Sequence, residues 1–346
     1  MSLDKFEVLD SNDKFKKQNV FINILWKFLE RGSAVIVTFI VQIILARILD
    51  PSDFGLASMI TVFVTISTVF VSGGLSNALV QKKDSDELDF STIFWFNIIV
   101  ALLLYLILYI VSPYVSSFYG YPQLTAMLRV LSIKILISAI NSIQLAYIAK
   151  TMSFRFYFFA TLIGKFLSGV IGVTVALLGG GAWALIVQTI SLVFFETIIL
   201  WFRVKWRPSF LFSIDRAKRL YSFAINIMFM SIVEILRDQL RTIFIGKKYD
   251  SNDLAYYDKG QLFPTNIVTN ISSSLTAVMF PVISNSNDNH DKALSICRKW
   301  LSMFAYCVFP ILLGLAITSK NVIKIVLTDK WIPVVPYLQF ACFAYI

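Results

Sequence analysis

Nine apolar segments constrain this sequence more than any motif in it, because each is long enough to cross the hydrocarbon core of a membrane. A membrane-spanning helix needs about 20 consecutive, mostly apolar residues. We place these segments at 21–48, 55–80, 91–111, 124–149, 155–178, 182–203, 219–246, 262–284 and 300–327, and a tenth begins near residue 335. The sequence therefore predicts an all-α polytopic membrane protein.

The composition excludes most other classes of protein. Hydrophobic residues make up 57% of the chain and charged residues only 15%, whereas about 25% of the residues in a soluble domain are charged. The alternating segments of a membrane β-barrel are absent from the sequence. The three cysteines and the single histidine follow no metal-binding or redox spacing, and no phosphate-binding loop or catalytic triad pattern occurs. We therefore expect no metal, no resident cofactor and no enzymatic site.

The basic residues predict the orientation of the chain. Lys and Arg collect in cytoplasmic loops of membrane proteins. Seventeen of them fall on the side of the N-terminus, in the tail and near 82–83, 150–155, 203–219 and 292–299, and only five fall on the other side. The N-terminus is therefore expected in the cytoplasm. This distribution also accounts for much of the net charge of +10 without a nucleic-acid partner.

A long basic loop divides the expected spans into two sets. We predict a cytoplasmic tail at 1–20, an N-terminal bundle of six spans at 21–203, a basic cytoplasmic linker at 204–218 and a partial C-terminal bundle at 219–346. Spans 1 and 7 then run in the same direction, as in a parallel internal repeat. An offset of 200 residues aligns Asp50 and Asp53 with Asp250 and Asp253. The fold class is therefore two pseudo-symmetric helical bundles, the second of them incomplete.

Charged residues inside the expected spans are the candidate substrate-binding site. Such residues are costly in the bilayer, and they usually face a cavity or one another. Four of them are spaced so that they share one face of span 7, where Glu234 is expected to pair with Arg237 or Arg241. The full set is Lys27, Glu30, Arg31, Lys134, Lys165, Glu196, Glu234, Arg237, Asp238 and Arg241.

Two interpretations of this set stay open. The charges could be structural ion pairs that hold the bundle together, or they could line a water-filled cavity. Six of the ten are positive, so a cavity would attract an anionic group such as phosphate or an acidic sugar. Two further patterns concern packing. The small residues Gly164, Ser168 and Gly172 predict a close contact between helices. Pro264, Pro281 and Pro310 predict kinks or helix ends, with a hinge as the functional alternative.

Several sequence motifs together resemble one family of transporters. They comprise Ala46–Leu56 and Gly73–Lys83 in the first half, and Ile245–Lys247, Asp253–Tyr257, Gly260–Pro264 and Leu327–Pro333 in the second. The chain resembles the Wzx-type polysaccharide flippases of the multidrug/oligosaccharidyl-lipid/polysaccharide exporter superfamily. Its residues that match the structural loop motifs of the family are Asp50, Pro51, Asp53, Phe54, Gly55, Gly246, Asp253 and Pro264.

The resemblance implies a fold, a substrate and a location. It implies two bundles around a central cavity in the bacterial cytoplasmic membrane. It also implies movement of an undecaprenyl-diphosphate-linked oligosaccharide from the inner to the outer leaflet by alternating access, for surface polysaccharide biosynthesis. Coupling to a proton or sodium gradient, contact with membrane lipids and association with glycan polymerase machinery are further implications. Family members have more spans than this chain, so we expect a C-terminally truncated member.

Three other functions compete with this one. A multidrug or small-solute antiporter of the same superfamily would favour acidic cavity residues, whereas the balance here is positive. A membrane-embedded glycan polymerase or ligase would need a large external loop, and the expected external loops are short. A non-functional remnant is the third alternative.

Overall fold

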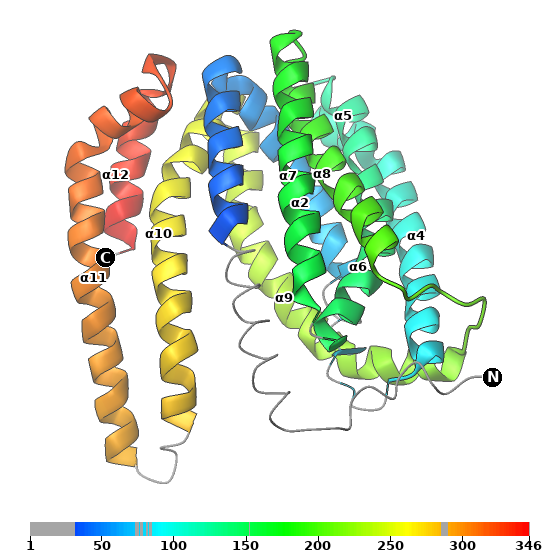
Figure 1. The fold of residues 1–346 in the computed structure, drawn as a ribbon. Coiled ribbons are helices and arrows are strands. Elements are labelled where there is room, and N and C mark those ends of the chain that lie inside the picture. The colour runs from blue at the N-terminus through cyan, green and yellow to red at the C-terminus, as the bar shows by residue number, and fades with distance from the viewer. Residues whose placement is uncertain are drawn as a thin grey trace. The chain divides into compact units, whose positions relative to one another are not determined.

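The computed structural model describes residues 32–72, 76, 79–80, 82, 85–151, 153–284 and 290–345. These residues form helices and short connections, and no strand occurs among them (Figure 1). A membrane offers no water to backbone groups, so spanning segments satisfy their own hydrogen bonds as helices. The helices are Gly32–Ile48, α2 (Pro51–Ser72), α4 (Glu87–Tyr119), α5 (Leu124–Leu131), α6 (Ile133–Thr151), α7 (Phe154–Leu177), α8 (Ala182–Arg203), α9 (Ile214–Lys248), α10 (Ser251–Ser284), α11 (His290–Val326), the short η1 (Asp329–Trp331) and α12 (Val334–Ala344).

The helices confirm the predicted class of fold. Within the described ranges, six helical segments are long and apolar enough to cross a membrane, and a pair in α9 that is bent by 46° adds a seventh. The chain is therefore a multi-pass membrane protein. Helix α10 has 34 residues, and Asn266 and Asn270 make its middle polar. Helices α10 and α11 continue past Pro264 and Pro310, so these prolines do not end their helices.

The first compact unit comprises Met1–Leu45 and Met59–Phe244. Helix α7 packs along α8, and α6 packs against both α4 and α8. The small residues of α7 permit this approach, since a Cβ atom added to Gly172 would lie 2.8 Å from the Cβ atom of Gln188 on α8. The predicted close contact between helices is thus confirmed.

The segment between α8 and α9 is packed onto this unit. Trp206 is buried beside Phe90 and Phe94 of α4. Ser209 accepts a hydrogen bond from Trp95 Nε1 at its carbonyl oxygen (2.9 Å), and its side chain hydrogen-bonds with Ser91. The predicted linker at 204–218 is therefore an integral part of the bundle, and α9 begins at Ile214, five residues before the predicted span.

The second compact unit joins Ala46–Ser58 to Ile245–Ile346. Helix α12 packs against α10 and α11. Trp331 is fully buried and donates a hydrogen bond from Nε1 to the carbonyl oxygen of Ala46 (2.7 Å). Arg47 donates to the carbonyl oxygens of Ile325 and Val326, at the end of α11. These contacts explain why 46–58 groups with the C-terminal half of the chain.

The contact-based units differ from the predicted bundles in two places. Residues 219–244 group with the first unit, and residues 46–58 group with the second. The predicted division follows the order of spans along the chain, whereas the compact units follow which segments lie close together in space. The division at the basic linker stays a prediction.

The two acidic turns of the predicted repeat both begin a helix. The backbone N–H of Asp53 bonds to the carbonyl oxygen of Asp50 (3.1 Å) at the start of α2. The backbone N–H of Asp253 bonds to the side chain of Asp250 (2.8 Å) at the start of α10. An acceptor at this position satisfies backbone donors that the first turn of a helix leaves unpaired. The same helix, acidic turn and helix therefore occur at both positions.

The first turns of α2 and α10 meet inside the second unit. A Cβ atom on Gly55 would lie 1.8 Å from the carbonyl oxygen of Ser251, so no larger residue fits without a shift of the backbone. Beside this contact, the buried Lys259 places its ammonium group 4.1 Å from the ring centre of Phe54. A cation over an aromatic face is attracted to it. The loop-motif residues of the first half thus act as packing elements.

Candidate functional site

Four charged residues lie midway along α9. The part of α9 from Ala224 to Lys248 is about 37 Å long at 1.5 Å per residue, and these residues occupy its middle. The Oδ1 atom of Asp238 lies 3.2 Å from Nε of Arg237 and 3.3 Å from Nη2 of Arg241. The expected pairing of the arginines with Glu234 is therefore wrong. Asp238, whose side chain is shorter than that of Glu234, lies between the two arginines in sequence and forms an ion pair with each.

The charged side chains of this stripe are exposed within the described structure. The exposed fraction of the side chain is 71% for Arg237, 47% for Asp238 and 52% for Arg241. Charged groups at this depth are too costly to face hydrocarbon, so they require water or polar groups in front of them. We call Glu234, Arg237, Asp238 and Arg241 the α9 stripe. Its two positive and two negative charges suit a ligand with several polar groups.

Lys165 lies in a second polar region, midway along α7. Its ammonium group donates hydrogen bonds to Thr38 Oγ1 (2.8 Å) and to the carbonyl oxygen of Ala34 (3.1 Å) on the helix Gly32–Ile48. Beside it is a cavity of about 120 Å³ that is lined by Thr38, Val41, Gln42, Lys165, Ser168, Gln188, Thr189 and Leu192. A water molecule takes up about 30 Å³ in the liquid. The cavity is therefore polar enough and large enough to hold a few waters.

Lys134 and Glu196 form a third region. Both side chains are half-buried, Lys134 at the start of α6 and Glu196 on α8. The negative charge of Glu196 acts on the Lys134 ammonium group. Glu196 also lies across from α7, since a Cβ atom added to Gly164 would be 2.9 Å from its Cγ atom. A neighbouring opposite charge lowers the cost of placing either group in a membrane.

The remaining predicted site residues are placed as follows. Lys27, Glu30 and Arg31 lie outside the described residues. Of the loop-motif residues, Asp50, Pro51, Asp53, Phe54 and Gly55 form the start of α2 and the turn before it, Gly246 is near the end of α9, and Asp253 and Pro264 lie on α10. All eight belong to the second unit. Among the residues that the structure describes, no three His, Cys, Asp or Glu side chains come together as a metal site.

A polar stripe on α10 was missed by the sequence analysis. Asn266, Thr269, Asn270 and Ser273 have the spacing of one helix face, and the first two are exposed. Asn266 Nδ2 donates to the carbonyl oxygen of Leu262 (2.8 Å), and Thr269 Oγ1 donates to that of Thr265 (2.7 Å). These bonds satisfy part of each polar group and leave the amide oxygen and hydroxyl lone pairs for a ligand. Their i, i+3, i+4, i+7 spacing was the signal in the sequence.

A charged network at the start of α4 was also missed. Asp89 is fully buried, and its carboxylate pairs with Lys82 Nζ (2.5 Å) and Arg216 Nη1 (3.1 Å). Arg216 pairs with Asp86 as well. Asp86 caps α4 by accepting a hydrogen bond from the backbone N–H of Asp89 (2.9 Å), and the Asp89 side chain accepts one from the backbone N–H of Asp86. This reciprocal capping was the signal in the sequence. We call Lys82, Asp86, Asp89 and Arg216 the α4 network.

The network changes the acidity of Asp86, which lies before the span. Burial by itself would raise the pKa of this carboxyl group. The hydrogen bond from Arg216 and the backbone hydrogen bond of Asp89 outweigh that effect, so the pKa of Asp86 is lower than its ordinary value. Hydrogen bonds to the charged form of a carboxylate favour that form. Asp86 is therefore an ion that helps to fix α4 to α9.

Comparisons with known proteins agree with the described fold. A family model described as "Polysaccharide biosynthesis protein" matches residues 44–336. An uncharacterized membrane protein in the cps region of Klebsiella pneumoniae is 26% identical over 329 residues, which cover 92% of this chain and 66% of the relative. The teichuronic acid biosynthesis protein TuaB of Bacillus subtilis is 28% identical over 272 residues, which cover 77% of this chain and 56% of TuaB. The chain thus spans less than two thirds of the length of these relatives.

Two solved structures share the fold. The lipid II flippase MurJ in an inward closed conformation aligns with a TM-score of 0.72 and 15% identity, over 93% of this chain and 75% of MurJ. An inward-facing multidrug resistance transporter of the MATE family and the MOP superfamily aligns with a TM-score of 0.65 and 10% identity, over 90% of this chain and 78% of the transporter. At these identities the likeness concerns the fold alone.

Proposed function

Because this chain belongs to the polysaccharide biosynthesis protein family, we propose that it is part of a flippase. The flippase moves a lipid-linked oligosaccharide from the inner to the outer leaflet of the bacterial cytoplasmic membrane by alternating access, for the synthesis of a surface polysaccharide. The N-terminus lies in the cytoplasm, as the distribution of Lys and Arg predicts. Glycan polymerase machinery takes up the product on the other side.

The observation that carries the proposal is the α9 stripe. Its charges are exposed in the middle of 224–246, a mostly apolar part of α9 with no other charged residue, where only a polar path through the membrane can accommodate them. An oligosaccharide diphosphate has both hydroxyl groups and negative charges. Arg237 and Arg241 suit its phosphates, because a guanidinium group binds a phosphate through two parallel hydrogen bonds. Glu234 and Asp238 suit its hydroxyl groups.

Energy input is a further part of the proposal. Glu234 and Asp238 are carboxylates at membrane depth, and such groups serve as proton or cation sites in transporters. We propose that one of them takes up a proton or a sodium ion when the arginines release the diphosphate. An inward proton or sodium gradient would then drive the return of the empty carrier.

A flipping assay tests the proposal. The full protein is placed in vesicles with a fluorescent polyprenyl-diphosphate disaccharide, and the fraction of probe that reaches the outer leaflet is followed over time. Replacement of the exposed Arg237 by Gln should slow flipping about tenfold, which corresponds to ~1.4 kcal/mol. Lys320→Gln removes another exposed cation, near the end of α11, and should leave the rate unchanged. Equal rates in all three proteins would reject the role of the stripe, and no flipping by the unaltered protein would reject the function.

A second candidate function is export of a small solute. The likeness to the multidrug MATE transporter in fold favours it. In the same vesicles, a cationic dye should then be taken up in response to a proton or sodium gradient. Dye transport without lipid flipping would favour the antiporter.

A further inference from the structure

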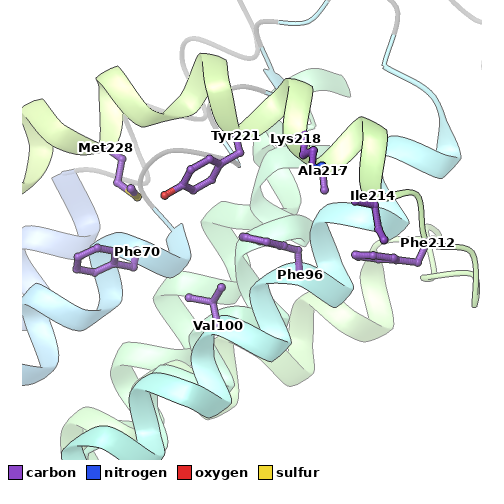
Figure 2. A pocket seen from close by; sticks show the side chains of 9 residues that line it. All are labelled: Phe70, Phe96, Val100, Phe212, Ile214, Ala217, Lys218, Tyr221 and Met228. Carbon is purple, nitrogen blue, oxygen red and sulfur yellow. The ribbon is translucent and has the colours of Figure 1, made fainter.

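A pocket in the first unit is not part of the polar regions described above. It has a volume of about 440 Å³ and lies between the end of α2, the middle of α4 and the start of α9. Pockets of about 300–1,000 Å³ that are lined by apolar and aromatic side chains are typical ligand sites. Here Phe70, Phe96, Phe212 and Tyr221 supply four aromatic rings (Figure 2). The walls therefore suit a hydrocarbon chain.

Only two side chains of the lining carry a polar group outside the backbone, Lys218 and Tyr221. Figure 2 shows Lys218 on α9 between Phe212 at one end of the pocket and Phe70 and Met228 at the other. Lys218 is exposed, and no ion pair or hydrogen bond of its ammonium group is found with any residue that the structure describes. Arg216, two residues earlier, is already held by Asp86 and Asp89. Lys218 is therefore the cation that is available to a ligand at this pocket.

The surroundings of the pocket have the features of a membrane surface. Exposed apolar residues lie in the last turn of α8 and in the segment after it, with exposed fractions of 82% for Phe202 and 91% for Phe210. Basic residues lie between them at Arg203 and Lys205. Apolar side chains that enter the acyl region beside Lys and Arg at the headgroups are typical of an interfacial segment. The pocket thus lies where a lipid headgroup would meet Lys218 and its chain would enter the apolar part.

We propose that this pocket binds a polyprenyl diphosphate, with the diphosphate at Lys218 and the first isoprene units between the aromatic side chains of α2, α4 and α9. It would hold the lipid part of the substrate in the leaflet on the side of the basic loops, before the sugar part reaches the α9 stripe. The inference rests on the proposed function for the identity of the lipid. A diphosphate has more negative charge than the headgroup of an ordinary anionic phospholipid, so the free cation favours the carrier lipid.

Photo-crosslinking tests this site. The full protein in phosphatidylcholine nanodiscs is incubated with a polyprenyl diphosphate that has a photoreactive group in its first isoprene units, and the labelled peptides are identified by mass spectrometry. We expect label on the segments of α4 and α9 around Phe96 and Tyr221. Label confined to other helices would overturn the proposal.

Two pairs of variants make the test specific. Lys218→Gln should weaken binding of the probe about fivefold, the size of one exposed charge contact, whereas Arg219→Gln should leave binding unchanged. Val100→Phe fills the pocket and should abolish the label, whereas Ile99→Phe enlarges an exposed neighbour outside it and should not. The proposal fails if the members of each pair behave alike in protein that remains folded.

Competition and flipping separate the remaining outcomes. Unlabelled polyprenyl diphosphate should displace the probe at far lower concentration than phosphatidylglycerol. Equal displacement by both would make this a general phospholipid site and overturn the assignment to the carrier lipid. Flipping by the unaltered protein without label in the pocket would reject only the pocket, whereas label without flipping would reject the proposed function and leave the pocket in place.

Discussion

The α4 network and the α9 stripe each consist of two acidic and two basic residues, yet they differ in burial and in what they connect. The network buries Asp89 completely and joins residues more than a hundred positions apart, from α4 to α9. The stripe is exposed, and its ion pairs connect neighbours on a single helix. A buried carboxylate that loses its partners is costly, whereas exposed pairs contribute little to stability. The network therefore suits a structural role, and the stripe is free to bind a ligand.

The largest effect should follow from a change in the network. Asp89→Asn removes the charge that faces both Lys82 and Arg216 and weakens the cap of α4. We expect a loss of about 3 kcal/mol in the free energy of unfolding, measured by thermal unfolding in detergent. Glu87→Gln removes an exposed acid from the same helical turn and should change stability little. A similar result for the two variants would mean that the network is not structural.

A change at Lys165 should have an intermediate effect on the free energy of unfolding. Lys165→Met keeps the length of the side chain but removes the donor to Thr38 Oγ1 and to the carbonyl oxygen of Ala34. Stability should fall by about 1 kcal/mol, the net contribution of such hydrogen bonds, and the flipping rate should fall as well. Lys165→Arg keeps the positive charge, so its flipping rate should be closer to that of the unaltered protein than its free energy of unfolding is. If Lys165→Met changes only the free energy of unfolding and not the flipping rate, Lys165 has a structural role, as the α4 network does.

A small effect on stability is expected in the stripe. Asp238→Asn removes both ion pairs of Arg237 and Arg241, yet the free energy of unfolding should change by less than about 0.5 kcal/mol. Flipping should nevertheless slow, since the balance of charge in the stripe changes. Thermal unfolding and the vesicle assay on the same preparation measure both. A loss of stability comparable to that of Asp89→Asn would erase the distinction between the two clusters.

The smallest effect concerns acid pH. Because the pKa of Asp86 is lower in the folded protein than its ordinary value, the folded state binds its proton less readily than the unfolded state does. The stabilising effect is therefore fully present above the ordinary carboxyl pKa of about 3.9 and is lost as the pH falls through the lowered pKa. Unfolding curves of the unaltered protein and of Asp86→Asn should differ at pH 7 and converge as the pH is lowered. If the two proteins still differ in stability at acid pH, the effect of Asp86 comes from the packing of its side chain and not from its charge.

The sequence predicts the helices well and the ion pairs poorly, for a physical reason. Long apolar segments form helices in a membrane whatever their neighbours are, so the expected spans match α7 and α8 closely, whereas α4 extends beyond its expected span at both ends. The pairing of Asp89 with Arg216 depends instead on how distant segments pack. The start of α9 at Ile214 was missed because its charged first turn looked like a loop. Ala217 and Leu220, both buried, are the residues that hold this turn against the bundle.

The packed segment after α8 also determines where the polypeptide chain tolerates an insertion. A polar, basic stretch between two spans would ordinarily be chosen for an epitope tag or a split-protein junction, since exposed loops accept insertions. Here the burial of Trp206 and the bonds of Ser209 leave little free chain to receive one. The turn after α7 is the better choice, because Leu178 is 82% exposed and a Cβ atom on Gly179 would meet nothing within 4 Å. A tag after Gly179 should preserve membrane expression, and the same tag after Arg207 should abolish it.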